Sequence, residues 1–314
     1  MIKLRQYQIE AAQAAAESLT KVKKTLLVLP TASGKSLINA EIVRRAQAKG
    51  LRVLCLCAQA EILMQNQQAI HNLAPEIATS IYCAQLNQKD LSAAVVIASR
   101  DSFVRIKEPP KFDLIITDEA HMVSDNPKTS YGKIFAAVGA KYHVGLTGTP
   151  WRLGNGRIWG ESGFYDEVAY NVSLNFLTDQ GYLSPHKFPK LKTTIDTSNV
   201  RKNSRDFILS ELEAVSSSAK VVGSCLDQWE ALAGDRKCSI FFCCTRAHAD
   251  AVASQLSQRL GDDKVGYIDG TFARKNREKF FTKARFGGYK ALVNIGVLTT
   301  GVDFPLIDCA VLLR

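Results

Sequence analysis

Short runs of consecutive apolar residues recur along the chain, separated by longer stretches of mixed polarity. In the first half they lie near residues 25–29, 52–58, 78–83, 94–99, 112–118 and 142–147, and in the second half near 238–244, 264–269, 290–296 and 309–314. A continuous apolar run of this length is typical of a strand that is buried on both faces of a parallel sheet. Because stretches that suit helices alternate with these strands, the pattern predicts an α/β fold with parallel sheets.

The spacing of the runs divides the chain into two domains. A chain of 314 residues is long enough for two separate cores. We assign residues 1–165 to the first domain, residues 166–205 to a segment that crosses between the domains, and residues 206–314 to the second domain. The second domain is expected to begin with a helix over residues 206–232.

The first apolar run leads into a loop that suits a bound phosphate. Residues 30–36 read Pro-Thr-Ala-Ser-Gly-Lys-Ser, and a helix is expected over residues 36–48. Free N–H groups of such a loop and of the helix start attract an anion. Lys35 supplies a charge for the β- and γ-phosphates of ATP, and the Ser36 hydroxyl can ligate Mg²⁺. The predicted ATP-binding residues of this loop are Pro30, Thr31, Ala32, Ser33, Gly34, Lys35 and Ser36.

A plainer interpretation of the same loop is a turn between a strand and a helix, because Leu29 stands where the general P-loop rule has glycine. The second motif decides against it. Residues 118–121 read Asp-Glu-Ala-His and close the fifth apolar run. Two acids at the end of a buried strand are costly unless a metal ion or a hydrogen-bond network receives them.

The chemistry of ATP hydrolysis gives each of these residues a role. Asp118 would hold Mg²⁺ through water, and Glu119 would polarise the attacking water. The predicted catalytic residues are Lys35, Asp118, Glu119 and His121, with Ser36 and Asp118 as Mg²⁺ ligands. A capping role for Asp118 at the next helix is the alternative.

With both motifs present in this order, the chain resembles the superfamily 2 helicases of the DEAD/DEAH kind over nearly its whole length. The resemblance implies two RecA-like P-loop domains, ATP and Mg²⁺ as cofactors, and a nucleic-acid partner. The family usually has glycine where this chain has Ala32.

Further motifs extend the resemblance through the first half. Residues 4–8, Leu-Arg-Gln-Tyr-Gln, resemble the Q motif, which implies that Arg5 and Gln8 bind the adenine of ATP. Residues 145–150, Gly-Leu-Thr-Gly-Thr-Pro, resemble motif III, which implies that Thr147 and Thr149 couple the ATP site to nucleic acid. Without the other motifs, an ordinary helix start and a strand-ending turn would explain these two segments.

Segments that resemble nucleic-acid-contacting motifs follow several strands. Residues 58–65 resemble motif Ia, residues 95–100 the next strand with its loop, residues 239–246 motif IV and residues 291–305 motif V. By this resemblance Gly301 and Asp303 face the ribose and the γ-phosphate of ATP. The expected nucleic-acid contacts are Gln59, Ser99, Arg100, Thr245, Arg246 and Thr271.

The phrasing of residues 145–153, 181–185 and 291–305 is most similar to the RadD-like group of bacterial and phage DNA-repair helicases. One family motif departs from the pattern: motif VI, Gln-x-x-Gly-Arg-x-x-Arg, should follow the last strand, where the sequence ends at Arg314. The resemblance therefore predicts a truncated chain with an incomplete second domain.

Charge and composition agree with a nucleic-acid partner. The net charge is +10, and residues 271–290 hold seven basic residues against one acid, Glu278. A solvated helix face and a phosphate-contacting face are equally good explanations of this segment. No apolar run could span a bilayer and the N-terminus does not read as a signal peptide, so we expect a cytoplasmic, nucleoid-associated monomer without a membrane partner. The eight cysteines, none in a Cys-x-x-Cys pair, are expected to be reduced core residues.

The predicted function is that of an ATP-dependent helicase or translocase, acting on DNA in preference to RNA, in repair or recombination. Three alternatives stay open. They are the motor subunit of a restriction or phage-defence system, an ATP-gated clamp that does not unwind, and a small-molecule kinase. The combination of Asp-Glu-Ala-His with Thr-Gly-Thr-Pro argues against the kinase.

Overall fold

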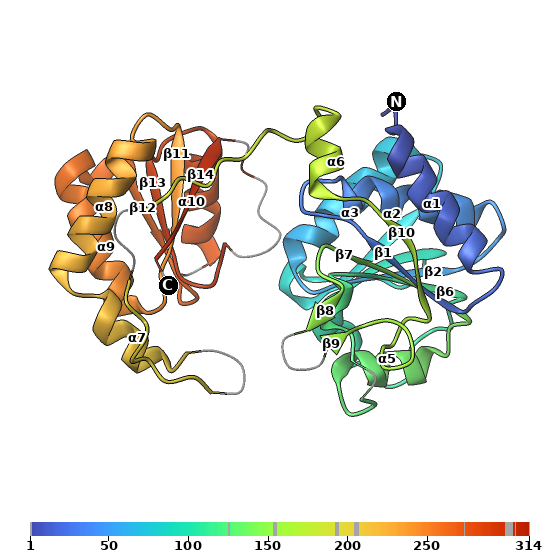
Figure 1. Cartoon of the computed structure of the whole chain (residues 1–314). Coiled ribbons are helices and arrows are strands. Elements are labelled where there is room, and N and C mark those ends of the chain that lie inside the picture. Colours follow the sequence, from blue (N-terminus) through green and yellow to red (C-terminus); the bar gives the residue numbers. More distant parts are fainter. Residues whose placement is uncertain are drawn as a thin grey trace. The chain divides into compact units, whose positions relative to one another are not determined.

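A computed structural model describes residues 2–124, 126–152, 156–191, 195–203, 207–272, 274–298, 304 and 306–313. They form two compact units, Met1–His186 and Lys187–Arg314. Each unit is built around a sheet of its own with helices on both faces, as Figure 1 shows.

The first unit has an eight-stranded sheet in the order β10-β1-β7-β6-β2-β5-β3-β4. Its strands are β1 Lys24–Val28, β2 Val53–Cys57, β3 Thr79–Cys83, β4 Gln88–Lys89, β5 Val95–Ser99, β6 Leu114–Asp118, β7 Tyr142–Thr147 and β10 Glu167–Asn171. All neighbours are parallel except β3 with β4. Each of the six apolar runs in the first half is a strand, so the prediction of a parallel sheet is confirmed there.

Helices cover this sheet on two sides because successive strand residues point to opposite faces. On one face α1 Gln6–Ser18, α2 Lys35–Gln47 and α3 Ala60–Leu73 pack on strand residues such as Leu27, Cys55 and Ile97. On the other face α4 Arg100–Phe103 and α5 Ser130–Val138 pack on residues such as Leu26, Leu54 and Val96. The parallel strands that carry motifs therefore all end at the same edge of the sheet, and helices support this sheet on both faces.

The end of the first unit differs from the prediction. Residues 166–186 were expected to cross between domains, but β10 pairs in parallel with β1, and Leu177 of α6 Leu174–Asp179 is fully buried in the same core. The first unit therefore extends to His186, and the second unit begins at Lys187. The half-buried pattern of β10 is the reason that no apolar run marks it in the sequence.

The second unit has a four-stranded parallel sheet in the order β12-β13-β11-β14. Its elements are α7 Leu209–Ser216, α8 Ala219–Ala233, β11 Cys238–Phe242, α9 Arg246–Leu260, β12 Val265–Ile268, α10 Arg274–Arg285, β13 Ala291–Asn294 and β14 Ile307–Leu312. The four predicted strands are all present. The single helix expected over residues 206–232 is instead two helices, because the Ser218 side chain accepts the N–H of Val221 and starts α8 anew.

Several smaller sequence predictions can be compared with the structure. Five of the eight cysteines are buried, namely Cys55, Cys57, Cys83, Cys238 and Cys243, and burial raises the pKa of Cys55 to about 12. Two of the five histidines, His143 and His248, are also buried. Within the described residues, no helix combines the length and apolar character needed to traverse a membrane.

Candidate ATP site and nucleic-acid interface

The phosphate-binding loop lies at the carboxyl end of β1. It spans the residues between Val28 and the first residue of α2, Lys35. Gly34 has φ 77°, and a Cβ atom there would lie 2.5 Å from Nε2 of Gln8. Glycine is required at this position for both reasons. Ala32 also has a positive φ of 63°, which explains why glycine is usual at its position in the family.

The start of α1 is tied to this loop. The Tyr7 hydroxyl donates to the Ser33 carbonyl at 2.6 Å, and Nε2 of Gln8 donates to the same oxygen at 3.2 Å. Oε1 of Gln8 accepts the backbone N–H of Arg5 at 2.9 Å. The structure therefore brings the expected adenine-binding residues to the expected phosphate-binding loop.

Tyr182 completes this side of the site, and sequence reasoning missed its role. The guanidinium of Arg5 lies 4.4 Å from the centre of the Tyr182 ring, and the rings of Tyr7 and Tyr182 are 5.5 Å apart. Residues 181–185 carried only a subgroup resemblance in the sequence. The contact joins residues almost 180 positions apart in the chain, so no local pattern could have indicated it.

The acid motif lies at the carboxyl end of β6, two strands from β1 in the sheet. Asp118 is only 7% exposed, and burial, followed by the nearby Glu119 charge, raises its pKa to about 6. Its Oδ1 accepts the backbone N–H of Glu119 at 2.8 Å. Glu119 itself has φ 49°, a left-handed conformation that strains a residue with a side chain. The short helix that follows begins after Glu119, and Asp118 does not cap it.

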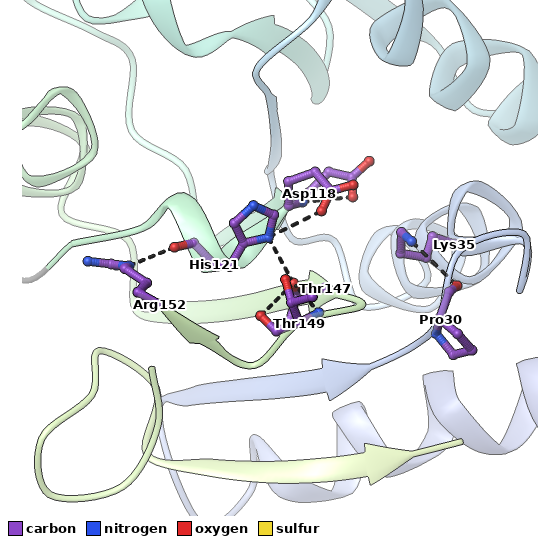
Figure 2. A network of polar contacts seen from close by, with 8 residues as sticks. Pro30, Lys35, Asp118, His121, Thr147, Thr149 and Arg152 are labelled. Atoms are coloured by element: carbon purple, nitrogen blue, oxygen red, sulfur yellow. Dashed lines mark hydrogen bonds and ion pairs between the residues drawn. The ribbon is translucent and has the colours of Figure 1, made fainter. Parts of the chain in front are cut away.

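His121 connects the acid motif to motif III, as Figure 2 shows. Its Nδ1 lies 3.3 Å from Oε2 of Glu119 and 3.1 Å from Oγ1 of Thr147. The hydrogen bond from His121 lowers the pKa of Glu119 and keeps this carboxylate charged. The Thr147 hydroxyl donates to the Thr149 carbonyl at 3.2 Å and accepts the Thr149 N–H at 3.1 Å.

Lys35 and Arg152 lie on either side of this network. Nζ of Lys35 contacts the Pro30 carbonyl at 3.5 Å, and its charge lowers the pKa of Glu119. Nε of Arg152 donates to the backbone carbonyl of His121 at 2.6 Å. Arg152 lies two residues after the end of motif III and was not among the predicted site residues.

The side chains of this edge fit a bound Mg²⁺ ion, which prefers oxygen ligands. Asp118 offers a carboxylate and Ser36 a hydroxyl, and both stand at the carboxyl edge of the sheet near Lys35. Among the described residues there is no group of three or more histidine, cysteine and acidic side chains that would hold a metal without a nucleotide.

The expected nucleic-acid contacts in the first unit follow two adjacent strands, β2 and β5. Gln59 is the N-cap residue of α3. Ser99 is 7% exposed, and its hydroxyl caps α4 by accepting the N–H of Ser102 at 3.2 Å. Arg100 pairs with Asp101 at 2.7 Å. Both Ser99 and Arg100 therefore make contacts within the first unit, at the carboxyl end of β5.

In the second unit Asp269 joins two of the expected contacts. Nε of Arg246 lies 3.0 Å from Oδ2 of Asp269. Oδ1 of Asp269 accepts the Thr271 N–H at 2.8 Å and the Thr271 hydroxyl at 2.6 Å. Thr245 caps α9 by accepting the N–H of His248. Gly301 and Asp303 lie outside the described residues.

Comparison with known families accounts for both units. Residues 1–152 match the family described as "Type III restriction enzyme, res subunit", and residues 221–314 match "Helicase conserved C-terminal domain". The chain belongs to the helicases of superfamily 2. The two units of this superfamily 2 chain are therefore RecA-like domains.

Curated relatives of this superfamily 2 helicase resemble it along most of its length. The "51.5 kDa protein" of a Lactococcus phage (isolate 7-9) is 26% identical over 90% of this chain and 56% of its own. The "Putative ATP-dependent helicase IRC3" of Saccharomyces cerevisiae is 24% identical over 99% of this chain and 47% of its own. The "DNA 3'-5' translocase XPB2" of Sulfurisphaera tokodaii is 24% identical over 99% of this chain and 75% of its own. This chain spans about half the length of the first two relatives.

Solved structures support the fold. The Type ISP restriction-modification enzyme LlaBIII bound to DNA superposes with a TM-score of 0.71 at 16% identity, over 99% of this chain and 26% of that one. Dbp5 of S. cerevisiae bound to RNA and ADP BeF3 superposes with a TM-score of 0.58 at 13% identity, over 97% of this chain and 74% of that one. At these identities the likeness concerns the fold alone.

Proposed function

We propose that this superfamily 2 chain is an ATP-driven motor that moves along nucleic acid and that its substrate is DNA. The observation that carries the proposal is the His121 network. One imidazole nitrogen contacts both Glu119, beside the ATP site, and Thr147, in motif III. Such a link lets the state of the nucleotide act on the segment that leads to Arg152. The names of the relatives, an ATP-dependent helicase and a DNA translocase, support the same activity.

In the proposed reaction the protein mainly places charge around the γ-phosphate. Lys35 neutralises phosphate charge, and Ser36 and Asp118 would hold Mg²⁺. When bound, this ion neutralises charge on the β- and γ-phosphates. Glu119 orients the attacking water and accepts its proton. His121 holds Glu119 by a contact of 3.3 Å, which keeps the carboxylate ionised.

The base of ATP is proposed to bind beside Gln8 and Arg5. The amide of Gln8 contacts the loop through Ser33, and Arg5 lies against Tyr182. This arrangement places a planar guanidinium next to the phosphate-binding loop. The Gln8 amide is only 3% exposed, and it keeps one N–H and one lone pair beyond its hydrogen bonds to Ser33 and Arg5. Hydrogen bonds to an amide distinguish adenine from guanine, so we expect a preference for ATP over GTP.

The test compares ATP turnover of the whole chain with and without single-stranded DNA, for the wild type and Glu119→Gln. The wild type should be stimulated by DNA. The variant should bind ATP with Mg²⁺ as the wild type does and lose nearly all turnover, because only the carboxylate charge is removed. Glu76→Gln, at an exposed glutamate, is the matched control and should behave as the wild type. Wild-type turnover by Glu119→Gln would contradict the assignment.

A motor of a restriction or phage-defence system is the second candidate function. The match of residues 1–152 to the res subunit family favours it. The two functions differ in the fate of the duplex. A motor that only translocates displaces a triplex-forming strand and leaves a forked duplex paired, whereas a helicase separates the fork. A clamp gives neither result with ATP.

The remaining properties are also proposed here. We propose that the protein works as a monomer in the cytoplasm, near the nucleoid, in DNA repair as RadD-like helicases do. Size-exclusion chromatography with light scattering tests the monomer, and single-stranded RNA in place of DNA tests the preference between the two.

A further inference from the structure

We infer that a pocket lined by Arg152 and Arg157 binds a backbone phosphate of the nucleic acid and transmits its presence to the acid motif. The inference rests on the proposed function and adds a binding site to it. Neither arginine was among the site residues predicted from the sequence. The pocket lies entirely within the first unit and encloses about 270 Å³.

A short hairpin and a tight turn build the pocket. Strands β8 Trp151–Arg152 and β9 Gly156–Arg157 pair antiparallel, with Arg152 opposite Gly156. The turn that follows returns through Gly163, where a Cβ atom would lie 2.0 Å from the backbone nitrogen of Trp159. Only glycine permits this turn, and it brings Ser162 and Phe164 to the pocket wall.

The lining of the pocket is cationic. Arg152 and Arg157 contribute two positive charges, and Ser124 and Ser162 contribute hydroxyl groups. No carboxylate is found among the lining residues that the structure describes. An anion entering this pocket therefore finds two arginines in the lining and, among the lining residues that are described, no acid to compete with it, which favours a strongly acidic group such as a phosphate.

Both guanidinium groups are held in place while N–H groups remain for a ligand. The Arg157 guanidinium lies 5.2 Å from the centre of the Trp159 ring. Stacking on a ring leaves the N–H groups at the edge of the guanidinium able to donate. Arg152 uses Nε for the His121 carbonyl. Its other nitrogens have no hydrogen-bond partner among the described residues.

The neighbouring surface suits a nucleic-acid strand better than a free anion. Trp151 is 57% exposed and lies opposite Arg157 in the hairpin. An exposed aromatic ring beside a phosphate site offers a stacking surface for a base, and this pair of features is typical of single-strand binding. A free phosphate would use the arginines and leave the ring without a role.

The same arginine connects this pocket to the ATP site. Arg152 holds the His121 carbonyl at 2.6 Å, and His121 contacts Glu119 and Thr147 through Nδ1. In Figure 2 the backbone of His121 stands between Arg152 and Lys35. A phosphate bound by Arg152 thus restrains the residue that positions Glu119. Arg152 acts as a positioning residue and Arg157 as a binding residue.

The test uses Arg157→Ala, because Arg157 makes no contact with the acid motif. Binding of a labelled oligothymidine to the whole chain is measured over a range of salt concentrations. Loss of one phosphate contact should lower the slope of log Kd against log salt by about 0.7. The DNA concentration that half-maximally stimulates ATP turnover should rise several-fold. Arg157→Lys should retain most of the slope.

Lys49→Ala is the matched control, since Lys49 is exposed beyond the far end of α2 and also carries one positive charge. It should keep the wild-type slope. An unchanged slope in Arg157→Ala, or an equal loss in Lys49→Ala, would overturn the inference. Binding of inorganic phosphate that requires Arg157, combined with unchanged DNA binding by Arg157→Ala, would reassign the pocket to a free phosphate. If the wild type neither binds DNA nor responds to it, the proposed function fails as well.

Discussion

Replacing Gly34 by alanine tests the geometry of the phosphate-binding loop directly. The residue has φ 77°, and the new Cβ atom would lie 2.5 Å from Nε2 of Gln8. Gln8 is 3% exposed and has little space in which to move. We therefore expect the substitution to displace the Gln8 side chain from the Ser33 carbonyl and from the Arg5 N–H.

The expected magnitude follows from these contacts. The left-handed backbone costs about 1 kcal/mol for a residue with a Cβ atom. Each of the two Gln8 hydrogen bonds contributes about 1 kcal/mol to the free energy of unfolding. The total is about 3 kcal/mol, which lowers the Tm of a unit of this size by roughly 6–12 °C. Affinity for ATP should fall at the same time, because the displaced amide is the expected contact for adenine.

Gly50→Ala is the control. Gly50 has nearly the same φ, 71°, but a Cβ atom there has nothing within 4 Å. Its substitution should lower stability by about 1 kcal/mol, the backbone term alone, and leave ATP affinity unchanged. Calorimetry with and without ATP measures both variants. Equal losses of stability, or unchanged ATP affinity in Gly34→Ala, would show that Gln8 does not support this loop. Removing the Gln8 side chain first should make the effect of Gly34→Ala smaller, since the two changes then share one interaction.

Three further predictions concern residues outside the motifs. Tyr182→Ala should weaken ATP binding about 2- to 5-fold by releasing Arg5, while Tyr182→Phe should not, since a phenyl ring retains the cation–π contact; titration with a fluorescent ATP analogue measures both. Asp269→Ala should lower the affinity for single-stranded DNA by releasing Arg246 and Thr271. Asp262→Ala makes an equal change in charge at an exposed aspartate and should not lower this affinity. A gain in affinity with both variants would mean that only net charge matters. His143 should make the first unit less stable in acid, because burial and the nearby Lys24 charge lower its pKa to about 4. The unfolded chain binds a proton near pH 6.5 and the folded chain does not, so about 3 kcal/mol of stability present above pH 6.5 should be lost as pH falls to 4. His143 packs between the rings of Phe135 and Phe164, where a phenylalanine side chain can replace it. In His143→Phe the Tm should therefore change less between pH 6.5 and pH 4 than in the wild type.

The strands could be predicted because burial on both faces leaves a direct mark on the sequence. Strands such as β2, β5 and β6 are buried at all five positions, so each begins with an apolar run of at least three residues. Strand β10 escaped prediction because its residues are only half-buried at the edge of the sheet. Strand β10 pairs with β1 although the two strands lie more than 140 residues apart in the sequence, so this pairing depends on the tertiary fold. The break between α7 and α8 was missed because a serine suits a helix interior or a cap, and the sequence alone does not say which.

The candidate site divides in the same way. Lys35, Asp118 and Glu119, which are predicted to meet phosphate or water, and the predicted coupling residue Thr147 stand in short motifs, because each needs a fixed spacing from a strand end. Tyr182, Arg152 and Asp269 were not predicted. Each has ordinary neighbours in the sequence and acquires its role only from a contact made by the fold.

These three residues share a further property: each holds a motif residue from outside the motif. Tyr182 lies against Arg5, Arg152 holds the His121 carbonyl, and Asp269 holds Arg246. The motif residues are proposed to bind ATP or nucleic acid or to carry the chemistry, whereas the outer residues fix where the motif residues stand. Substituting a motif residue should therefore change the rate of the chemical step. Substituting an outer residue should instead change how strongly ATP and nucleic acid affect each other, because coupling between two sites depends on shared restraints between them. Arg152 is the strongest case, since its guanidinium contacts the backbone of the acid motif and the same residue lines the cationic pocket.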